Sequence, residues 1–380
     1  MPVQESGSDS VVRTPGRTRE RFRMLAPMGA LVVLGAGVSQ MGDATDPGGW
    51  FSHLLPDQGP GEAMNILLVG TDSRDWNLIT PEEKQSFRLG GVACDCTDTI
   101  MVVHLSGDRK SADVVSLPRD SLVELPAHHD RRTNAEHAPH LSKINGAWAE
   151  GGADLTLQTV ESVTGLKIDK FLQVDFRRFM DTVNTLGGVD VCTAVPLQDP
   201  STGLDLAPGT HHVAGGPSLQ YVRSRKVDHQ ADLGRIQRQQ RFLMSFLTKM
   251  SQEDVLNRPD VLRKLSETFV GTEPVSRGFS ATELFELALS LRDLSPASVE
   301  LATVPISGFD QNIRGIGSTL KWDHEKAEQV FAAVRDEKPL VNNAPPSTGP
   351  LGEYWPVQGN SLTCDAPIVP NAQAPASPAS

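Results

Sequence analysis

Short apolar runs of strand length recur through the middle of the chain. Several are rich in β-branched residues and end at glycine or at polar turn residues, which is typical of buried strands. Residues 171–176 also alternate between apolar and polar positions. The predicted strands cover residues 65–70, 99–105, 112–117, 171–176, 189–195 and 298–305.

Helical periodicity fills much of the sequence between these strands. The first helical stretch is interrupted at Gly151 and Gly152, because glycine disfavours a helix interior. Residues 197–216 are loop-like and predict a hairpin. The predicted helices cover residues 145–164, 177–186, 233–250, 254–272, 280–293 and 324–336. Since helices and strands are interspersed, the pattern predicts an α/β layered domain.

The N-terminal segment combines an arginine-rich start with an uncharged stretch. Residues 1–23 are polar, and residues 24–41 carry no charge. As a helix, the uncharged stretch would be roughly 27 Å long, close to the thickness of a bilayer core. With arginines on its N-terminal side, we predict a cytoplasmic segment 1–23, a single-pass transmembrane anchor 24–41 at the cell membrane, and an extracytoplasmic remainder. A cleaved signal peptide is the alternative.

The rest of the chain divides by composition. Residues 42–62 are rich in glycine and proline and predict a linker. The folded domain is expected to span residues 63–341. Residues 342–380 are rich in proline, alanine and serine, and we predict a mostly disordered tail because such a composition buries little apolar surface.

Composition and charge restrict the class of ligand. A hydrophobic content of 38% allows one large core or two modest ones. The net charge of −12 and the pI near 5.3 argue against a nucleic-acid binder. Neither a Walker lysine loop nor a GxGxxG motif is present, so a nucleotide site has no support.

One basic cluster interrupts this acidic background. Arg223 and Arg225 would share one face of an extended segment, while Arg235 and Gln239 would share one face of a helix. Converging guanidinium groups hold phosphate through paired hydrogen bonds, so the cluster predicts a polyanion site. A solvated basic helix face is the alternative. The arginines of the cluster are Arg223, Arg225, Arg235, Arg238 and Arg241.

Three further candidates lie at the ends of predicted strands. Asp72 follows the first strand, Asp98 precedes the second and Arg119 follows the third. Strand ends of α/β sheets commonly open onto a ligand crevice. Carboxylate oxygens suit a Mg²⁺ ion that also binds phosphate, and Arg119 would add a phosphate contact. The alternative for each aspartate is a turn or helix cap.

Cysteine and histidine add two smaller features. An even number of cysteines in an exported chain predicts one or two disulfides, and three complete pairings stay open. A metal site of Cys94 and Cys96 with His104 is the weaker alternative. Four histidines crowd a polar loop; we interpret them as solvated, with a metal role as the alternative. These residues are Cys94, Cys96, Cys192 and Cys364, and His128, His129, His137 and His140.

The ordered motifs resemble those of the LytR-CpsA-Psr (LCP) family over roughly residues 64–250. They read NILLVGTDSR, TDTIMVVHL, VVSLPRDSLVELP, KINGAWAEGG, TLGGVDV and LQYVRSRKVDHQADLGRIQRQQRFL. The resemblance implies an α-β-α sandwich around a mixed sheet, with an apolar pocket for a polyprenyl chain. It implies a membrane-anchored phosphotransferase that moves a phosphoglycosyl unit from a polyprenyl-pyrophosphate carrier to peptidoglycan.

The resemblance also assigns roles to individual residues. Asp72 and Asp98 match the metal-binding acids, expected to hold Mg²⁺ or Mn²⁺. Apart from the resemblance, the reaction chemistry makes Asp72 a candidate base for the attacking hydroxyl. Arg238 and Arg241 match less closely and are expected at the rim. The pyrophosphate-binding positions fall on Arg119, Arg223, Arg225, Arg235 and Gln239. The long stretch between Asp72 and Asp98, and the histidine loop before Lys143, depart from the family pattern.

Other functions compatible with these residues stay open. A non-catalytic envelope regulator would need neither the metal nor the arginines. A pyrophosphatase would use the same site with water as the acceptor. A DNA-binding regulator is disfavoured by the acidic charge and the predicted export.

Overall fold

The computed structural model describes most of the chain after residue 60. The described residues are 61–72, 79–90, 95–228, 230–251, 255, 258–269, 275–349 and 352–366. All of them belong to one unit, Gln58–Ser380.

A mixed six-stranded sheet forms the centre of this unit. The strands in spatial order are β18 (Val357–Gln358), β13 (Val299–Thr303), β3 (Ala112–Ser116), β2 (Thr97–Leu105), β1 (Met64–Thr71) and β8 (Lys170–Val174). The β1–β8 and β3–β13 pairs are parallel. The β1–β2, β2–β3 and β13–β18 pairs are antiparallel. The expectation of a mixed sheet is confirmed.

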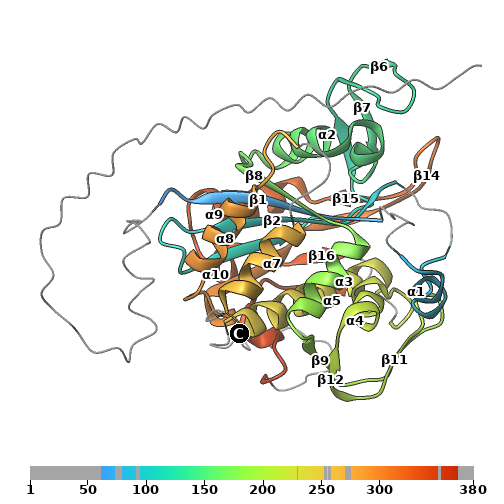
Figure 1. Cartoon of the computed structure of the whole chain (residues 1–380). Coiled ribbons are helices and arrows are strands. Elements are labelled where there is room, and N and C mark those ends of the chain that lie inside the picture. The colour runs from blue at the N-terminus through green and yellow to red at the C-terminus, as the bar shows by residue number, and fades with distance from the viewer. Residues whose placement is uncertain are drawn as a thin grey trace, which may run out of the picture. The chain divides into compact units, whose positions relative to one another are not determined.

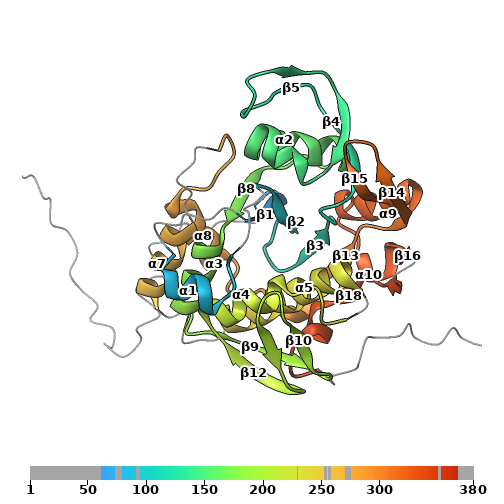
Figure 2. The same ribbon diagram turned by 90° about the vertical axis from the view of Figure 1, so that its right-hand side faces the viewer.

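Helices cover both faces of the sheet, as Figures 1 and 2 show. Successive side chains of one strand point to opposite faces of the sheet, since the side-chain period of a strand is two. Leu67 and Val69 pack with α2 (Gly146–Thr164) and α9 (His324–Arg335). Ile66, by contrast, packs with α5 (Ala231–Met250) and α8 (Ala281–Ser290). The α-β-α sandwich is confirmed.

The predicted interruption of the first long helix is present in α2. Gly152 has a φ of 67° and a ψ of −148° inside the helix. Glycine reaches this region without the steric penalty of a Cβ atom. The helix therefore bends at a position that the sequence marks.

The remaining elements are short and surround the sandwich. They pair as the two-stranded sheets β4–β7, β5–β6, β9–β12, β10–β11, β14–β15 and β16–β17. The strands are β4 (Leu122–Leu125), β5 (His128–His129), β6 (Glu136–His137), β7 (His140–Lys143), β9 (Val189–Thr193), β10 (Leu197–Asp199), β11 (Leu204–Leu206), β12 (Gly209–Val213), β14 (Ile306–Ile313), β15 (Gly317–Trp322), β16 (Ser347–Gly349) and β17 (Gly352–Tyr354). The helices are α1 (Pro81–Ser86), α3 (Phe176–Thr185), α4 (Gly215–Arg223), α7 (Pro259–Phe269), α10 (Leu340–Asn343), η1 (Pro296–Ser298) and η2 (Gly359–Leu362).

The prediction of a single-pass membrane location requires correction. Within residues 61–366, as far as the structure describes them, no helix combines the length and apolar character needed to cross a membrane. The predicted anchor at residues 24–41 lies outside the described residues, as does almost all of the predicted linker at residues 42–62.

The expected disorder of the C-terminal tail is wrong for most of its length. Residue pairs of β18 and β13 are hydrogen-bonded at the sheet edge. Cys364 forms a disulfide with Cys192, and their Cα atoms are 5.5 Å apart. Strand pairing and the disulfide therefore order a segment that its composition alone would leave unfolded. Cys96 is also disulfide-bonded, and Cys94 lies outside the described residues.

A buried acid in β3 generates a prediction about stability. Burial, together with the negative charges of Glu300 and Glu337, raises the pKa of Asp113 to about 7. The unfolded value is about 3.9. Asp113 thus favours folding most below about pH 4, and this contribution is lost as the pH rises through 7.

Asp113→Asn should therefore be more stable than the wild type at pH 8, by roughly 2–3 kcal/mol, and equal to it near pH 4. Urea unfolding at both pH values measures the difference. Asp293→Asn is the control, because the Asp293 side chain is 72% exposed. Parallel pH profiles for Asp113→Asn and the wild type would contradict the assignment.

Candidate functional site

A β-bulge at the end of the β1–β2 pair brings two carboxylates to one edge of the sheet. Gly70 lies opposite Thr99, but Thr71 lies opposite Thr97, so Asp98 is the extra residue. Bulges of this kind redirect a side chain and are frequent beside functional sites. The Asp72 N–H donates to the Cys96 carbonyl at 3.2 Å. The structure therefore brings the two predicted metal-binding acids to the same strand end.

Arg119 lies at the neighbouring strand end, just after β3. Its guanidinium contacts the Asp98 carboxylate. Its Nε also donates to Asp232 Oδ2 at 3.0 Å and lies 3.5 Å from Asp120 Oδ2. Burial would lower the pKa of Arg119, but Asp232, Asp98 and Asp120 raise it overall. Arg119 is thereby held as a cation between three acids.

Asp232, in the first turn of α5, contacts three of the predicted phosphate-binding arginines. Arg119 Nε and Arg235 Nη2 donate to Asp232 Oδ2, the latter at 3.3 Å, and Arg225 Nε donates to Asp232 Oδ1. Burial would raise the pKa of Asp232, but Arg235, Arg119 and Arg225 lower it to about 2. Asp232 is not among the residues predicted from the sequence; its spacing of three residues from Arg235 was the available signal.

Arg235 and Arg225 differ in their exposure to solvent. The Arg235 side chain is only 3% exposed, and it also donates to the Asp98 carbonyl at 3.1 Å. Burial lowers its pKa, against the opposing effect of Asp232 and Asp98. Arg225 is 44% exposed, and its N–H donates to Asp199 Oδ2 at 2.7 Å, which fixes the loop after α4. Arg235 is therefore buried and held in place by its partners, whereas Arg225 is accessible from solvent.

The other predicted residues make further contacts of their own. Arg223 stacks over the Phe176 ring at 4.6 Å from its centroid. Gln239 donates to the Val222 carbonyl at 3.3 Å. The expectation that Arg238 lies at the rim is wrong. Its guanidinium is buried and donates to Asp228 and to the Ser224 carbonyl, each at 2.6 Å.

An apolar cavity of about 400 Å³ lies beside Asp98 and Arg235. Its apolar lining comes from the sheet and from helices on one face of the sheet, and includes Ile66, Met101, Leu172, Phe242, Leu247 and Leu287. Its polar lining comprises Thr71, Asp98, Thr99, Arg223, Arg235 and Gln239 among others. The cavity therefore joins an apolar interior to the charged residues of the network.

The chemistry of Asp72 and Asp98 fits a hard divalent cation. Both supply only oxygen donors, and Asp72 is buried with a residue exposure of 6%. Mg²⁺ typically takes one or two carboxylates together with substrate phosphates. Cys96 is in a disulfide and is not available as a thiolate ligand.

Comparisons with known proteins agree on one family. A sequence model of the LytR_cpsA_psr family matches residues 51–336. The "Probable cell wall biosynthesis protein LcpB" of Corynebacterium glutamicum is 33% identical over 272 residues, which are 71% of this chain and 61% of that protein. The "Polyisoprenyl-teichoic acid--peptidoglycan teichoic acid transferase TagV" of Bacillus subtilis is 30% identical over 66% of this chain and 63% of that protein. The chain thus spans less than two thirds of the length of these relatives.

The fold is also similar to a solved structure. The crystal structure of B. subtilis TagV matches with a TM-score of 0.54 at 23% sequence identity, covering 73% of this chain and 99% of that one.

Asp232→Asn should lower the free energy of unfolding by about 2–3 kcal/mol at pH 7. The folded pKa is about 2 and the unfolded one about 3.9, so the contribution is complete above about pH 5 and is lost as the pH falls through 2. The difference between variant and wild type should be roughly halved at pH 3. Urea unfolding at pH 7 and pH 3 measures it. A difference that does not depend on pH would contradict the ionic role.

Proposed function

The chain belongs to the LytR-CpsA-Psr family, and on that premise we propose that it transfers a phosphoglycosyl unit from a polyprenyl-pyrophosphate carrier to peptidoglycan. The relatives support a role in cell-wall assembly, because one is named as a cell wall biosynthesis protein and another as a teichoic acid transferase. The residues of this chain support the chemical class of the substrate.

The continuity between the cavity and the arginine network is the observation that carries the proposal. A polyprenyl pyrophosphate has a long apolar tail and a doubly phosphorylated head. The apolar lining suits the tail, and Arg235 belongs both to the lining and to the network. One molecule with these two parts would satisfy both halves of the site.

Arg119, Arg225 and Arg235 bind the pyrophosphate in this proposal. Their guanidinium groups neutralise the phosphate charge that would repel a hydroxyl nucleophile, and they stabilise the departing phosphate. Because the aspartates already hold these arginines close together, little reorganisation is needed when the substrate binds.

Asp72 and Asp98 would hold the Mg²⁺ ion. When bound, this ion supplies further charge neutralisation at the phosphates.

The reaction itself is a displacement at phosphorus. A peptidoglycan hydroxyl forms the new P–O bond to the phosphate that bears the glycan, and the bridging P–O bond of the pyrophosphate breaks. Polyprenyl phosphate leaves with the bond electrons, and the hydroxyl proton passes to a base. We assign the base to Asp72, a carboxylate at the same strand end as Asp98.

Arg225→Ala should reduce transfer by about 100-fold or more, since it removes one preorganised charge from the transition state. Stability should change by less than about 1 kcal/mol, because the Arg225 side chain is 44% exposed and solvent screens its ion pair. The assay combines the purified chain, a polyprenyl-pyrophosphate oligosaccharide, Mg²⁺ and peptidoglycan fragments, and detects the phosphodiester-linked product by mass spectrometry.

Arg258→Ala is the matched control, since Arg258 is 61% exposed and pairs with Asp260. Full transfer by Arg225→Ala would contradict the arginine assignment. Release of glycan phosphate without linkage to peptidoglycan would instead indicate a hydrolase.

Shortening the polyprenyl tail should raise KM by about 100-fold or more, because each buried methylene contributes about 0.8 kcal/mol. The comparison uses two substrates with the same glycan pyrophosphate in the same detergent, one with a full-length tail and one with a tail of two isoprene units. Equal KM values for the two substrates would contradict the role of the cavity.

A further inference from the structure

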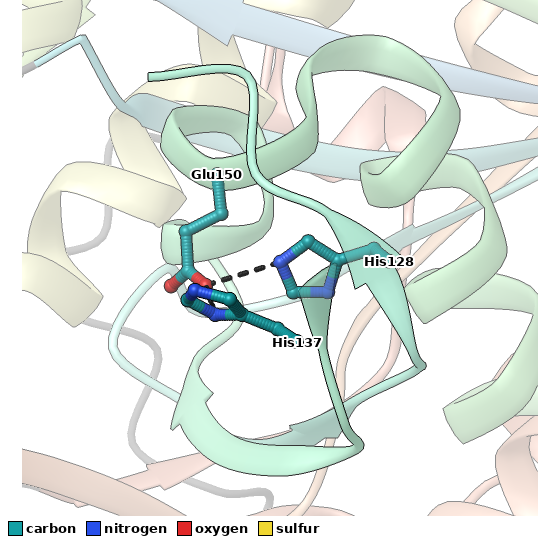
Figure 3. A group of neighbouring side chains, drawn as sticks. All are labelled: His128, His137 and Glu150. Carbon is teal, nitrogen blue, oxygen red and sulfur yellow. Dashed lines mark ion pairs between the residues drawn. The ribbon is translucent and has the colours of Figure 1, made fainter. Parts of the chain in front are cut away.

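A histidine cluster on the short hairpins before α2 has no role in the proposed transfer. In β5 and β6, His128 lies directly opposite His137. His140 is the first residue of β7, and Glu150 lies in α2 beside them. Figure 3 shows His128 and His137 directed toward the Glu150 carboxylate. We propose that these four residues bind a transition-metal ion of the Zn²⁺ type.

The distances support a single shared ion. Glu150 Oε2 lies 3.2 Å from His128 Nε2, 3.6 Å from His137 Nδ1 and 3.1 Å from His140 Nε2. The ligand atoms of His128, His137 and Glu150 all lie within 4.8 Å of one another. Two ligands at about 2.1 Å from a tetrahedral Zn²⁺ ion are about 3.4 Å apart. The observed separations from Oε2 lie on both sides of that value.

The hydrogen bonds of the rings leave the correct nitrogens for a metal. His128 Nδ1 lies 2.8 Å from the Pro126 carbonyl, and His140 Nδ1 lies 3.2 Å from the Ala138 carbonyl. A carbonyl only accepts, so Nδ1 carries the proton in both rings and Nε2 of the neutral ring presents a lone pair. Histidine ligands of metals are typically oriented by this kind of outer hydrogen bond.

The converging lone pairs of His128 Nε2 and Glu150 Oε2 would be stabilised by a cation between them. His128 Nε2 and Glu150 Oε2 are buried, and neither makes a hydrogen bond of normal geometry with the described residues. Their lone pairs would repel each other without a proton or a metal between them. The His128 side chain is 5% exposed and that of Glu150 is 15% exposed, so water screens this repulsion poorly. The interpretation of His128 as a solvated loop residue is therefore wrong.

The donor set selects the class of ion. Three imidazoles and one carboxylate suit Zn²⁺ and similar ions, whereas Mg²⁺ prefers oxygen ligands only. The cluster is thus chemically distinct from the Asp72 and Asp98 pair.

The position of the cluster points to a structural role. The Arg131 N–H donates to the Glu150 carbonyl at 2.8 Å. Further along the same segment, Lys143 pairs with Asp120 at 2.8 Å, and the Asn145 N–H donates to the Arg119 carbonyl at 3.2 Å. An ion in the cluster would fix the hairpins to α2, next to the segment that supports Arg119.

The test measures Zn²⁺ binding to the purified full chain without a histidine tag, by titration against a chromophoric Zn²⁺ chelator. We expect about one ion per chain. His137→Ala should weaken the affinity by about 100-fold, and Glu150→Gln, which keeps the side-chain shape, should also weaken it. His129→Ala is the control, because His129 lies in the same hairpin but contacts Glu136 and Asn134 instead.

A second readout is the rate of tryptic cleavage after Arg131 and Arg132. Zn²⁺ should slow cleavage in the wild type and in His129→Ala, but not in His137→Ala. Equal Zn²⁺ affinity in the wild type and both ligand variants would overturn the proposal, as would a wild-type chain that binds no Zn²⁺. The outcome is independent of the transfer reaction, since neither readout uses the lipid substrate.

Discussion

The architecture of the site depends on the ion pairs around Asp232. Arginines from the end of β3, from the loop after α4 and from α5 meet at this one carboxylate. Three guanidinium groups at this distance would repel one another, and the opposing charge of Asp232 and Asp98 makes their approach favourable. Positions more than 100 residues apart in the sequence are thus held in register before any ligand binds.

The same helix links the charged and apolar parts of the molecule. The first turns of α5 supply Asp232 and Arg235, and its later turns supply Phe242 and Leu247 to the apolar cavity. Strand β2 also contributes to both parts, because it carries Asp98 at its bulge and Met101 in the cavity lining. The polar and apolar sections of the site therefore cannot shift independently of each other.

The sequence predicted the elements whose signals are local. The predicted strands coincide with β1, β2, β3, β8 and β13 to within a few residues, and the α2 interruption is marked by glycine, so both were predicted correctly. The arginine positions were found through spacing and family resemblance. Asp232 was missed because a carboxylate in a helix first turn is common, and its importance depends on contacts with distant residues. Likewise, β18 has two residues and is a strand only because β13 lies beside it.

The histidine cluster was visible in the sequence, but its geometry was not. Residues His128 to His140 are polar and contain no long apolar run, which is typical of a solvated loop. The partner carboxylate lies in α2, and only the pairing of β5 with β6 turns the rings toward it. Composition cannot distinguish these two arrangements.

The strand order of the central sheet has a consequence for how the chain folds. The strands β1, β2 and β3 are consecutive antiparallel neighbours, so they can pair soon after they are synthesised. In contrast, β13 joins β3 across about 180 residues, and β18 completes the edge only near the C-terminus. At the opposite edge, β8 joins β1 across about 100 residues. Closing such long loops before their contacts form slows folding, so the sheet has a low contact order at its centre and a high one at its edges. A nascent chain that ends before β18 exposes the backbone edge of β13, which is the kind of edge that recruits other strands.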